Sequence, residues 1–129
     1  MTGVQTCALP IYGTITVIAS GHDPRTQEDK RLPFADAAPG MAGAETLLAL
    51  ALSLVRSGAL PLVKVLQAMT SAPAALFGLA GGTLAAGAPA DLVLFDEGAP
   101  WRIDGDLFQG AGNTPFDGQP VQEIGRAHV

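Results

Sequence analysis

The sequence predicts an α/β chain that holds the last strand, loop and helices of a (β/α)8 barrel, followed by strands of a small β-domain. A β-branched apolar run at 14–19 precedes a polar loop and then a run of helix formers, which is the order of a βα unit. After Gly82, Gly/Pro turns alternate with short apolar runs of strand length. A complete barrel needs about 250 residues, so 129 residues can hold only part of one.

The first predicted element is a buried strand over Thr14–Ala19, bounded by Gly13 and by Ser20-Gly21. The next residues, 20–43, are polar and punctuated by Pro and Gly, which indicates a long loop. Loops of this length in compact domains are usually functional or disordered. Because barrel enzymes carry their chemistry on the loops that follow the strands, we expect functional residues in this loop.

Three helical segments follow. Residues Ala44–Ser57 are helix formers that end before Gly58, so they predict a helix. A second helix is predicted from Pro61 to Met69, because Pro suits the first turn. A short helical turn at 71–76 is closed by Gly78.

The remainder reads as strands and turns. Short strands are predicted at Thr83-Leu84, at 92–95 and at Trp101–Ile103, and residues 113–118 form a turn-rich loop. Trp101 is the only Trp, and we expect it to pack within the small β-domain.

Composition excludes several classes of function. The net charge of −5 gives no basic surface for nucleic acid. No apolar run reaches the roughly 18 residues of a membrane span, and the N-terminus lacks a secretory signal. The lone Cys7 cannot form an internal disulfide. These features favour a cytoplasmic protein.

Both ends of the chain are expected to be non-native. Residues 123–129 back-translate to GAG ATC GGA AGA GCA CAC GTC, which resembles a short-read sequencing adapter, and residues 2–11 resemble its reverse complement. Such segments are excluded from fold reasoning. We therefore expect adapter-derived sequence at 1–11 and 123–129, the end of a barrel at 12–80, and a β-domain segment at 81–122.

The string Gly87–Asp96, preceded by Gly82-Thr83-Leu84, resembles the G-x-L-x-x-G-x-x-A-D-[LIV]-[LIV]-x-[LIVF]-D segment near the C-terminus of amidohydrolase-superfamily enzymes. In that superfamily the chain leaves a metal-dependent barrel there and enters a small β-domain. The resemblance therefore implies that this chain is the tail of a larger amidohydrolase.

Further blocks are similar to the S-D-H-A-P-H…E-K…P-F…G…G-x-E-T and N-T-P-F-x-G patterns of class I dihydroorotases. These blocks are Ser20–Pro24, Glu28–Lys30, Leu32–Ala35, Pro39-Gly40, Gly43–Thr46 and Asn113–Gly118. The resemblance implies reversible cyclisation of N-carbamoyl-L-aspartate to dihydroorotate in pyrimidine synthesis, with a zinc-activated water and a small-molecule substrate.

The same resemblance implies roles for four residues. The catalytic Asp of the family falls on Gly21, which has no side chain, so Asp23 is the expected catalytic base and metal ligand. Asp23 lies two residues on, which is the side-chain period of a strand. The substrate-contacting His of the family falls on Arg25, which could hold a substrate carboxylate. The Pro39-Gly40 backbone matches the loop that contacts the substrate ring. Residue chemistry alone favours an ordinary turn at Asp23-Pro24 and a surface position for His22.

Three functional readings stay open. The first is the C-terminal part of a zinc-dependent dihydroorotase. The second is an inactive dihydroorotase-like protein that serves as a partner of aspartate carbamoyltransferase. The third is a cyclic-amide hydrolase of the allantoinase or hydantoinase type. A homo-oligomer is compatible with any of them.

Overall fold

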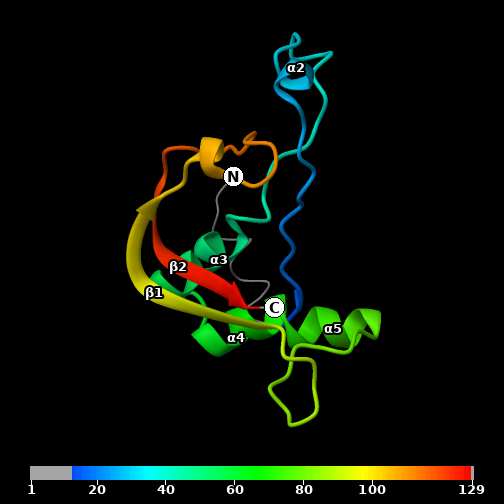
Figure 1. The fold of residues 1–129 in the computed structure, drawn as a ribbon, viewed down its shortest axis with the longest axis vertical. Helices are drawn as coiled ribbons and strands as arrows, with labels where there is room; N and C mark the ends of the chain where they lie inside the picture. Colours follow the sequence, from blue (N-terminus) through cyan, green and yellow to red (C-terminus); the bar gives the residue numbers. More distant parts are fainter. Residues whose placement is uncertain (1–12, 129) are drawn as a thin grey trace.

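The computed structural model describes the backbone of residues 13–128 and the side chains of residues 13–122. The predicted non-native segment 1–11 lies outside the described residues. Figure 1 shows an arm that projects from the body of the molecule and carries the one-turn helix α2 (Gln27–Lys30) at its tip. The body consists of a helical layer and a two-stranded β-ribbon.

The helical layer follows the sequence prediction closely. It comprises α3 (Leu47–Arg56), α4 (Leu62–Met69) and α5 (Ser71–Phe77). Pro61 is the N-cap of α4, and Gly78 ends α5 in the left-handed conformation with φ +66°. The predicted start of the first helix at residue 44 was wrong by three residues, because residues 44–46 form a turn. In that turn the buried Thr46 hydroxyl donates to the Gly43 carbonyl over 3.3 Å.

The β-ribbon pairs β1 (Leu92–Arg102) with β2 (Pro120–His128) in antiparallel register, with an irregularity between Asp96 and Pro100. The one-turn 3-10 helix η1 (Gly105–Leu107) follows β1. The predicted strands at 92–95 and 101–103 are thus parts of one longer strand, which ends at Arg102. The predicted strand at Thr83-Leu84 was wrong, because these residues lie in an exposed loop without ladder partners.

The predicted buried strand at 14–19 was also wrong. The segment forms no strand, and Thr14, Ile15 and Thr16 are exposed. Its backbone contact is the bond from Ile18 N to Ala68 O of α4, at 2.9 Å. A strand needs a hydrogen-bonded neighbour, and no other strand lies beside this segment within residues 13–128.

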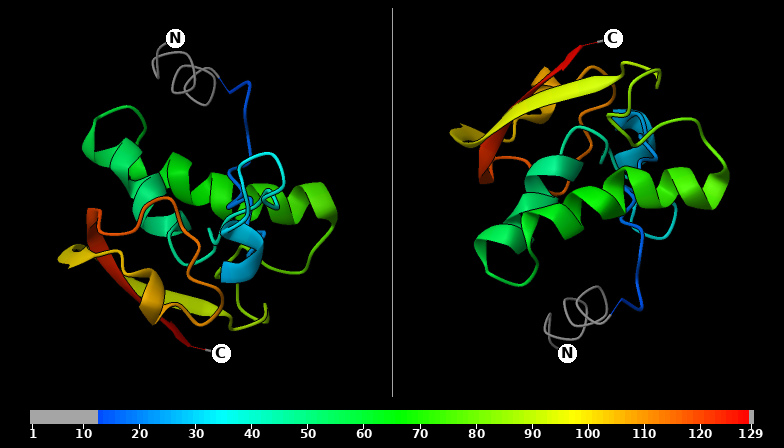
Figure 2. Two further views of the ribbon diagram at one scale, coloured as in Figure 1. Left: turned by 90° about the horizontal axis from the view of Figure 1, so that it is seen from above. Right: turned by 90° about the horizontal axis from the view of Figure 1, so that it is seen from below.

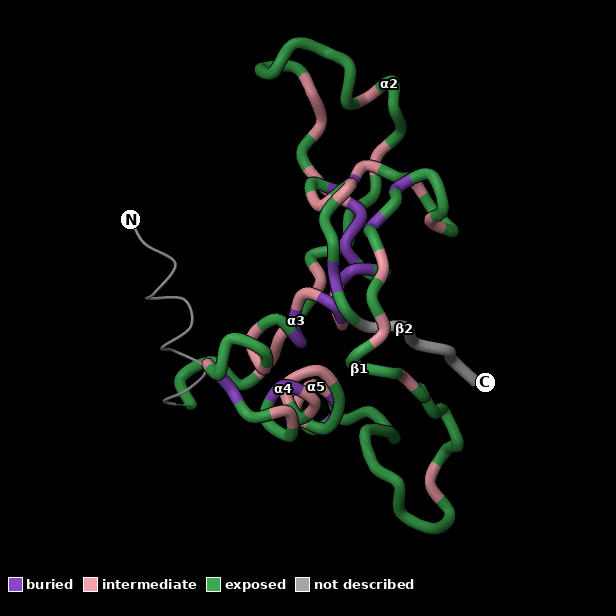
Figure 3. Tube along the Cα trace, turned by 90° about the vertical axis from the view of Figure 1, so that its left-hand side faces the viewer, coloured by how far each residue is buried: buried purple, intermediate pink, exposed green. Residues whose placement is uncertain are grey.

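Buried side chains form two clusters on either side of α3. One cluster joins Ala49 to the ribbon through Ile103 and Val121, and the partly buried Trp101, Phe108 and Phe116 pack against it. This confirms that Trp101 packs with the β segment. The other cluster joins Ala51 to Leu60 and Val65. Helix α3 therefore lies between the ribbon and α4, as Figures 2 and 3 show.

A considerable apolar surface remains open. Leu92, Val93 and Leu94 of β1 are exposed, as are Leu76 and Phe77 of α5. An apolar cavity of about 700 Å³ is lined by residues of α3, α4, β1 and the loop before β1. None of the helices within the described residues has the length and apolar character needed to cross a membrane.

Candidate functional site

The arm holds the predicted site residues on two legs that run side by side. His22 on the first leg and Met41 on the second form an isolated parallel bridge, in which Asp23 N donates to Met41 O over 2.8 Å. Near the tip, Ala38 N donates to Asp29 O over 3.2 Å. The two legs are thus joined at both ends, and the loop predicted over 20–43 has a defined shape.

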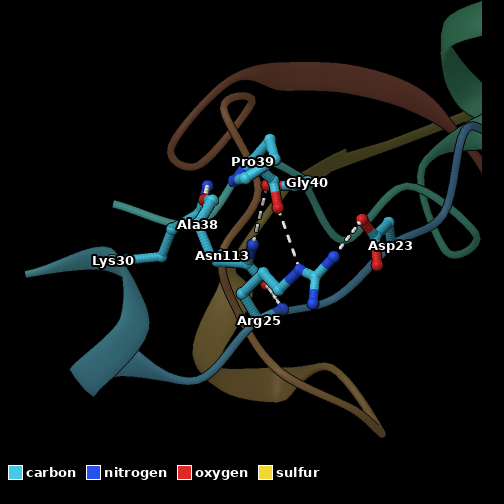
Figure 4. Close-up of polar contacts among 7 residues, drawn as sticks. All are labelled: Asp23, Arg25, Lys30, Ala38, Pro39, Gly40 and Asn113. Carbon is cyan, nitrogen blue, oxygen red and sulfur yellow. Dashed lines mark hydrogen bonds and ion pairs between the residues drawn. The ribbon is translucent and has the colours of Figure 1, made fainter. Parts of the chain in front are cut away.

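Asp23 and Arg25 form an ion pair on the first leg. Arg25 Nη2 lies 2.7 Å from Asp23 Oδ2, and Arg25 Nε donates across to Pro39 O over 2.9 Å (Figure 4). The Arg25 side chain is 37% exposed and that of Asp23 is 51% exposed. A pair this open to water contributes only about 0.2–1 kcal/mol to stability. An anionic ligand could therefore compete for the guanidinium at little cost to the fold.

Gly40 lets the second leg approach Asp23 closely. A Cβ at Gly40 would lie 2.6 Å from Asp23 Oδ2, and the backbone there has φ +115°, where other residues are strained. Only a residue without a side chain fits both conditions. The Asp23 carboxylate is therefore placed directly against the Pro39-Gly40 backbone.

Asn113 connects this arrangement to the C-terminal part of the chain. Its side-chain Oδ1 accepts from Arg25 N over 3.0 Å, and its Nδ2 donates to Gly40 O over 3.2 Å. Its main-chain carbonyl accepts from Ala42 N over 3.1 Å. In Figure 4 the Asn113 side chain lies between the two legs of the arm.

His22 has a local structural role. Its Nδ1 accepts hydrogen bonds from the backbone N–H groups of Gly43 and Ala44, each over 3.2 Å. The ring therefore holds the base of the second leg.

Basic side chains surround the outer face of the site. Arg25 and Asn113 both line a cavity of about 460 Å³, together with Lys30 and Arg31. Three of the seven Lys and Arg residues of this acidic chain thus line one cavity. Lys30 Nζ is also fixed, by donation to Ala38 O over 2.9 Å (Figure 4). Asp106 lines the same cavity, so its three basic and one acidic side chains carry a net charge of +2, which favours a small anionic ligand.

The described residues do not by themselves fit a zinc ion. Zinc needs three or four protein ligands, and the side chains described, those of residues 13–122, include no group of three or more His, Cys, Asp or Glu placed to hold a metal. Asp23 offers one carboxylate, of which Oδ2 is already paired with Arg25.

The structure therefore brings together all four residues predicted from the sequence, namely Asp23, Arg25, Pro39 and Gly40, and adds Asn113. The resemblance block at 113–118 contains Asn113, but its turn-rich composition gave no sign that the side chain would reach the arm. Glu45 also contacts a residue far along the chain, since its side chain accepts a hydrogen bond from Gln109 N over 2.9 Å.

Comparison with known proteins gives consistent results. The amidohydrolase family matches residues 27–123. The dihydroorotase of Anaeromyxobacter dehalogenans is 43% identical over 108 residues, which cover 83% of this chain and 25% of that protein. The dihydroorotase of Pelobacter propionicus is 41% identical over 111 residues, covering 85% of this chain and 26% of that protein.

Among solved structures, an L-hydantoinase (dihydropyrimidinase) from Arthrobacter aurescens superposes with a TM-score of 0.86 at 30% identity. The match covers 96% of this chain and 30% of that one. The chain thus spans about a quarter of the length of the curated relatives it matches.

Proposed function

Because the chain belongs to the amidohydrolase family, we propose that it is the C-terminal part of a longer dihydroorotase-like enzyme, here called the parent protein. The parent protein would interconvert dihydroorotate and N-carbamoyl-L-aspartate in cytoplasmic pyrimidine synthesis. The identity of 41–43% to two dihydroorotases favours this substrate over hydantoins. The match to a hydantoinase structure is at 30% identity.

One observation carries the proposal: Arg25, Pro39 and Gly40 converge beside Asp23 on a single arm. Both substrates of the proposed reaction carry carboxylates, and a guanidinium is well suited to bind a carboxylate. The Pro39-Gly40 backbone would lie along the substrate ring. Arg25 would anchor the substrate, and the basic cavity beside it would favour its negative charge.

In hydrolysis, water adds to the ring carbonyl carbon and a base accepts a proton from that water. The ring C–N bond then breaks as the leaving nitrogen takes up a proton from the protonated base. We assign that role to Asp23. Zinc, when bound, would supply Lewis-acid polarisation. Asp23 is the ligand that this chain would contribute, and the remaining ligands would lie in the part of the parent protein outside this chain.

A second function is favoured by one specific observation. Gly21, at the position of the family's catalytic Asp, offers no carboxylate, and Asp23 Oδ2 is paired with Arg25. The parent protein would then be an inactive dihydroorotase-like partner of aspartate carbamoyltransferase or of a further copy of itself.

The test is an assay of the purified parent protein with dihydroorotate, hydantoin and allantoin as substrates, each with and without a zinc chelator. We expect turnover of dihydroorotate above the other two and its loss on chelation. Preferred turnover of hydantoin or allantoin would contradict the substrate assignment. No turnover of any substrate, together with co-purification of aspartate carbamoyltransferase, would support the second function instead.

A further inference from the structure

We infer that Asn113 is a positioning residue for substrate binding, which holds Arg25 in the orientation needed to receive a substrate carboxylate. The inference rests on the proposed function for its kinetic consequence. Its structural part is independent of that function.

The Asn113 side chain fixes both ends of the contact that Arg25 makes across the arm. At one end, its Oδ1 holds the main-chain N of Arg25 over 3.0 Å. At the other end, its Nδ2 holds the carbonyl of Gly40, next to the Pro39 carbonyl that receives Arg25 Nε. One amide group therefore sets the spacing between the base of Arg25 and the backbone that orients its guanidinium.

The geometry separates positioning from simple attachment. The loop that carries Asn113 stays attached to the arm through its main-chain carbonyl, which accepts from Ala42 N. Removing the side chain leaves that bond in place. A variant at Asn113 therefore changes the orientation of Arg25 while preserving the attachment of the loop.

An amide is the group that this position requires. The side chain must accept a hydrogen bond from an N–H and donate one to a carbonyl, and Asn does both. A carboxylate can only accept, so it would keep the bond to Arg25 N and lose the bond to Gly40 O.

The first experiment measures amide hydrogen exchange at single residues of the parent protein. Asn113→Ala should speed exchange of the Arg25 amide roughly tenfold, because loss of a hydrogen bond frees that group. Asn113→Asp should leave the Arg25 amide protected. Exchange of the Ala42 amide should stay unchanged in both variants, which is the internal control.

The second experiment measures steady-state kinetics with dihydroorotate. Asn113→Ala and Asn113→Asp should each raise KM roughly five- to tenfold, the factor that a lost hydrogen bond predicts. We expect kcat to stay within about twofold, since Asn113 does not touch reacting atoms. Gln109→Ala is the matched control, because the Gln109 side chain is exposed and makes no hydrogen bond within residues 13–122, and the variant keeps the backbone N–H that donates to Glu45.

Unchanged Arg25 exchange in Asn113→Ala would overturn the inference. So would a fall in kcat with unchanged KM, which is the result expected if the side chain served folding alone. If the wild-type parent protein turned over no dihydroorotate, the proposed function would fail. The hydrogen-exchange experiment would still decide whether Asn113 positions Arg25.

Discussion

At the scale of single residues, Asp23 and Arg25 act as a pair. Oδ2 of Asp23 lies 2.7 Å from Nη2 of Arg25, so a change at either residue alters the charge that the other one faces. Substitutions at the two residues should therefore be distinguished by the kinetic parameter that each changes most, which is kcat for Asp23 and KM for Arg25.

Asp23→Asn in the parent protein should lower kcat by roughly 100-fold or more, because a neutral amide cannot accept the proton from water. KM should change only a few-fold, through the weakened contact with Arg25. Steady-state kinetics with dihydroorotate measures both. Asp36→Asn is the matched control, since Asp36 is an exposed carboxylate on the same arm.

A restoring variant completes that test. In Gly21→Asp combined with Asp23→Ala, the carboxylate returns to the family position. The Gly21 backbone has φ +61°, a conformation that Asp tolerates better than most residues, and a Cβ there meets nothing within 4 Å. We expect activity to exceed that of Asp23→Ala alone. Turnover of Asp23→Asn within a few-fold of wild type would show that Asp23 is an ordinary turn residue.

Arg25→Ala should mainly weaken substrate binding. Loss of a charge-assisted contact worth roughly 1.5–3 kcal/mol raises KM by about 10- to 150-fold, while kcat changes less. Lys64→Ala is the control, because Lys64 is an exposed basic residue on α4 that does not line the cavity beside Arg25. Equal KM values for the two variants would remove Arg25 from the substrate site.

Gly40→Ala should distort the site. The added methyl group would lie 2.5 Å from the Asp23 carbonyl, which is backbone and cannot move aside easily, at a φ that Ala rarely adopts. We expect the parent protein to lose most dihydroorotate turnover at substrate saturation. Gly110→Ala should behave as wild type, since a Cβ there meets nothing within 4 Å. Similar activity in the two variants would contradict the close approach at Asp23.

At the scale of elements, local signals predicted the helices well. Pro61 and Gly78 mark helix boundaries through their own backbone preferences, so α4 begins and α5 ends close to where the sequence indicates. The run at 14–19 has the composition of a strand but forms none, because pairing depends on distant segments. The sequence analysis did not predict α2, although Thr26 is a residue type that commonly caps a helix. In the structure the Thr26 hydroxyl accepts from Asp29 N, as a helix cap does.

The candidate site likewise contains residues that the sequence predicted and one that it did not. Its four predicted residues came from resemblance to a family, and the structure places them together. Asn113 could not be found by spacing, since its bond to Arg25 spans 88 residues. Such contacts appear only once the fold brings the C-terminal loop to the arm.

Removal of both predicted adapter segments should preserve the body of the molecule. Deleting 1–11 and 123–129 removes the pairing of β2 residues 124–128 with Leu92–Asp96, but it keeps Val121 and its cluster. We expect unchanged helical circular dichroism and a Tm within about 5 °C, the shift of roughly 1 kcal/mol in a small domain. Loss of helical signal would contradict the adapter interpretation.

At the scale of the whole molecule, the isolated chain should be inactive and prone to associate. Leu94 is 78% exposed and Phe77 is 68% exposed, so apolar surface faces water on both the ribbon and the helices. Within residues 13–128, each strand of the two-stranded ribbon also has one edge without a strand partner. We expect concentration-dependent association by sedimentation and no measurable hydrolysis of dihydroorotate. Stoichiometric tight zinc binding by the monomer, or turnover, would refute this prediction.

The long span from Arg25 to Asn113 bears on the order in which a ribosome makes the protein. The arm is synthesised first, and the bond between Arg25 and Asn113 can form only after a further 88 residues have been added. At about 5–20 residues per second, that delay is roughly 4 to 18 seconds. A product cut short before residue 113 would carry Arg25 without the amide that holds it. The arm would thus take its working shape only in a polypeptide translated past that point.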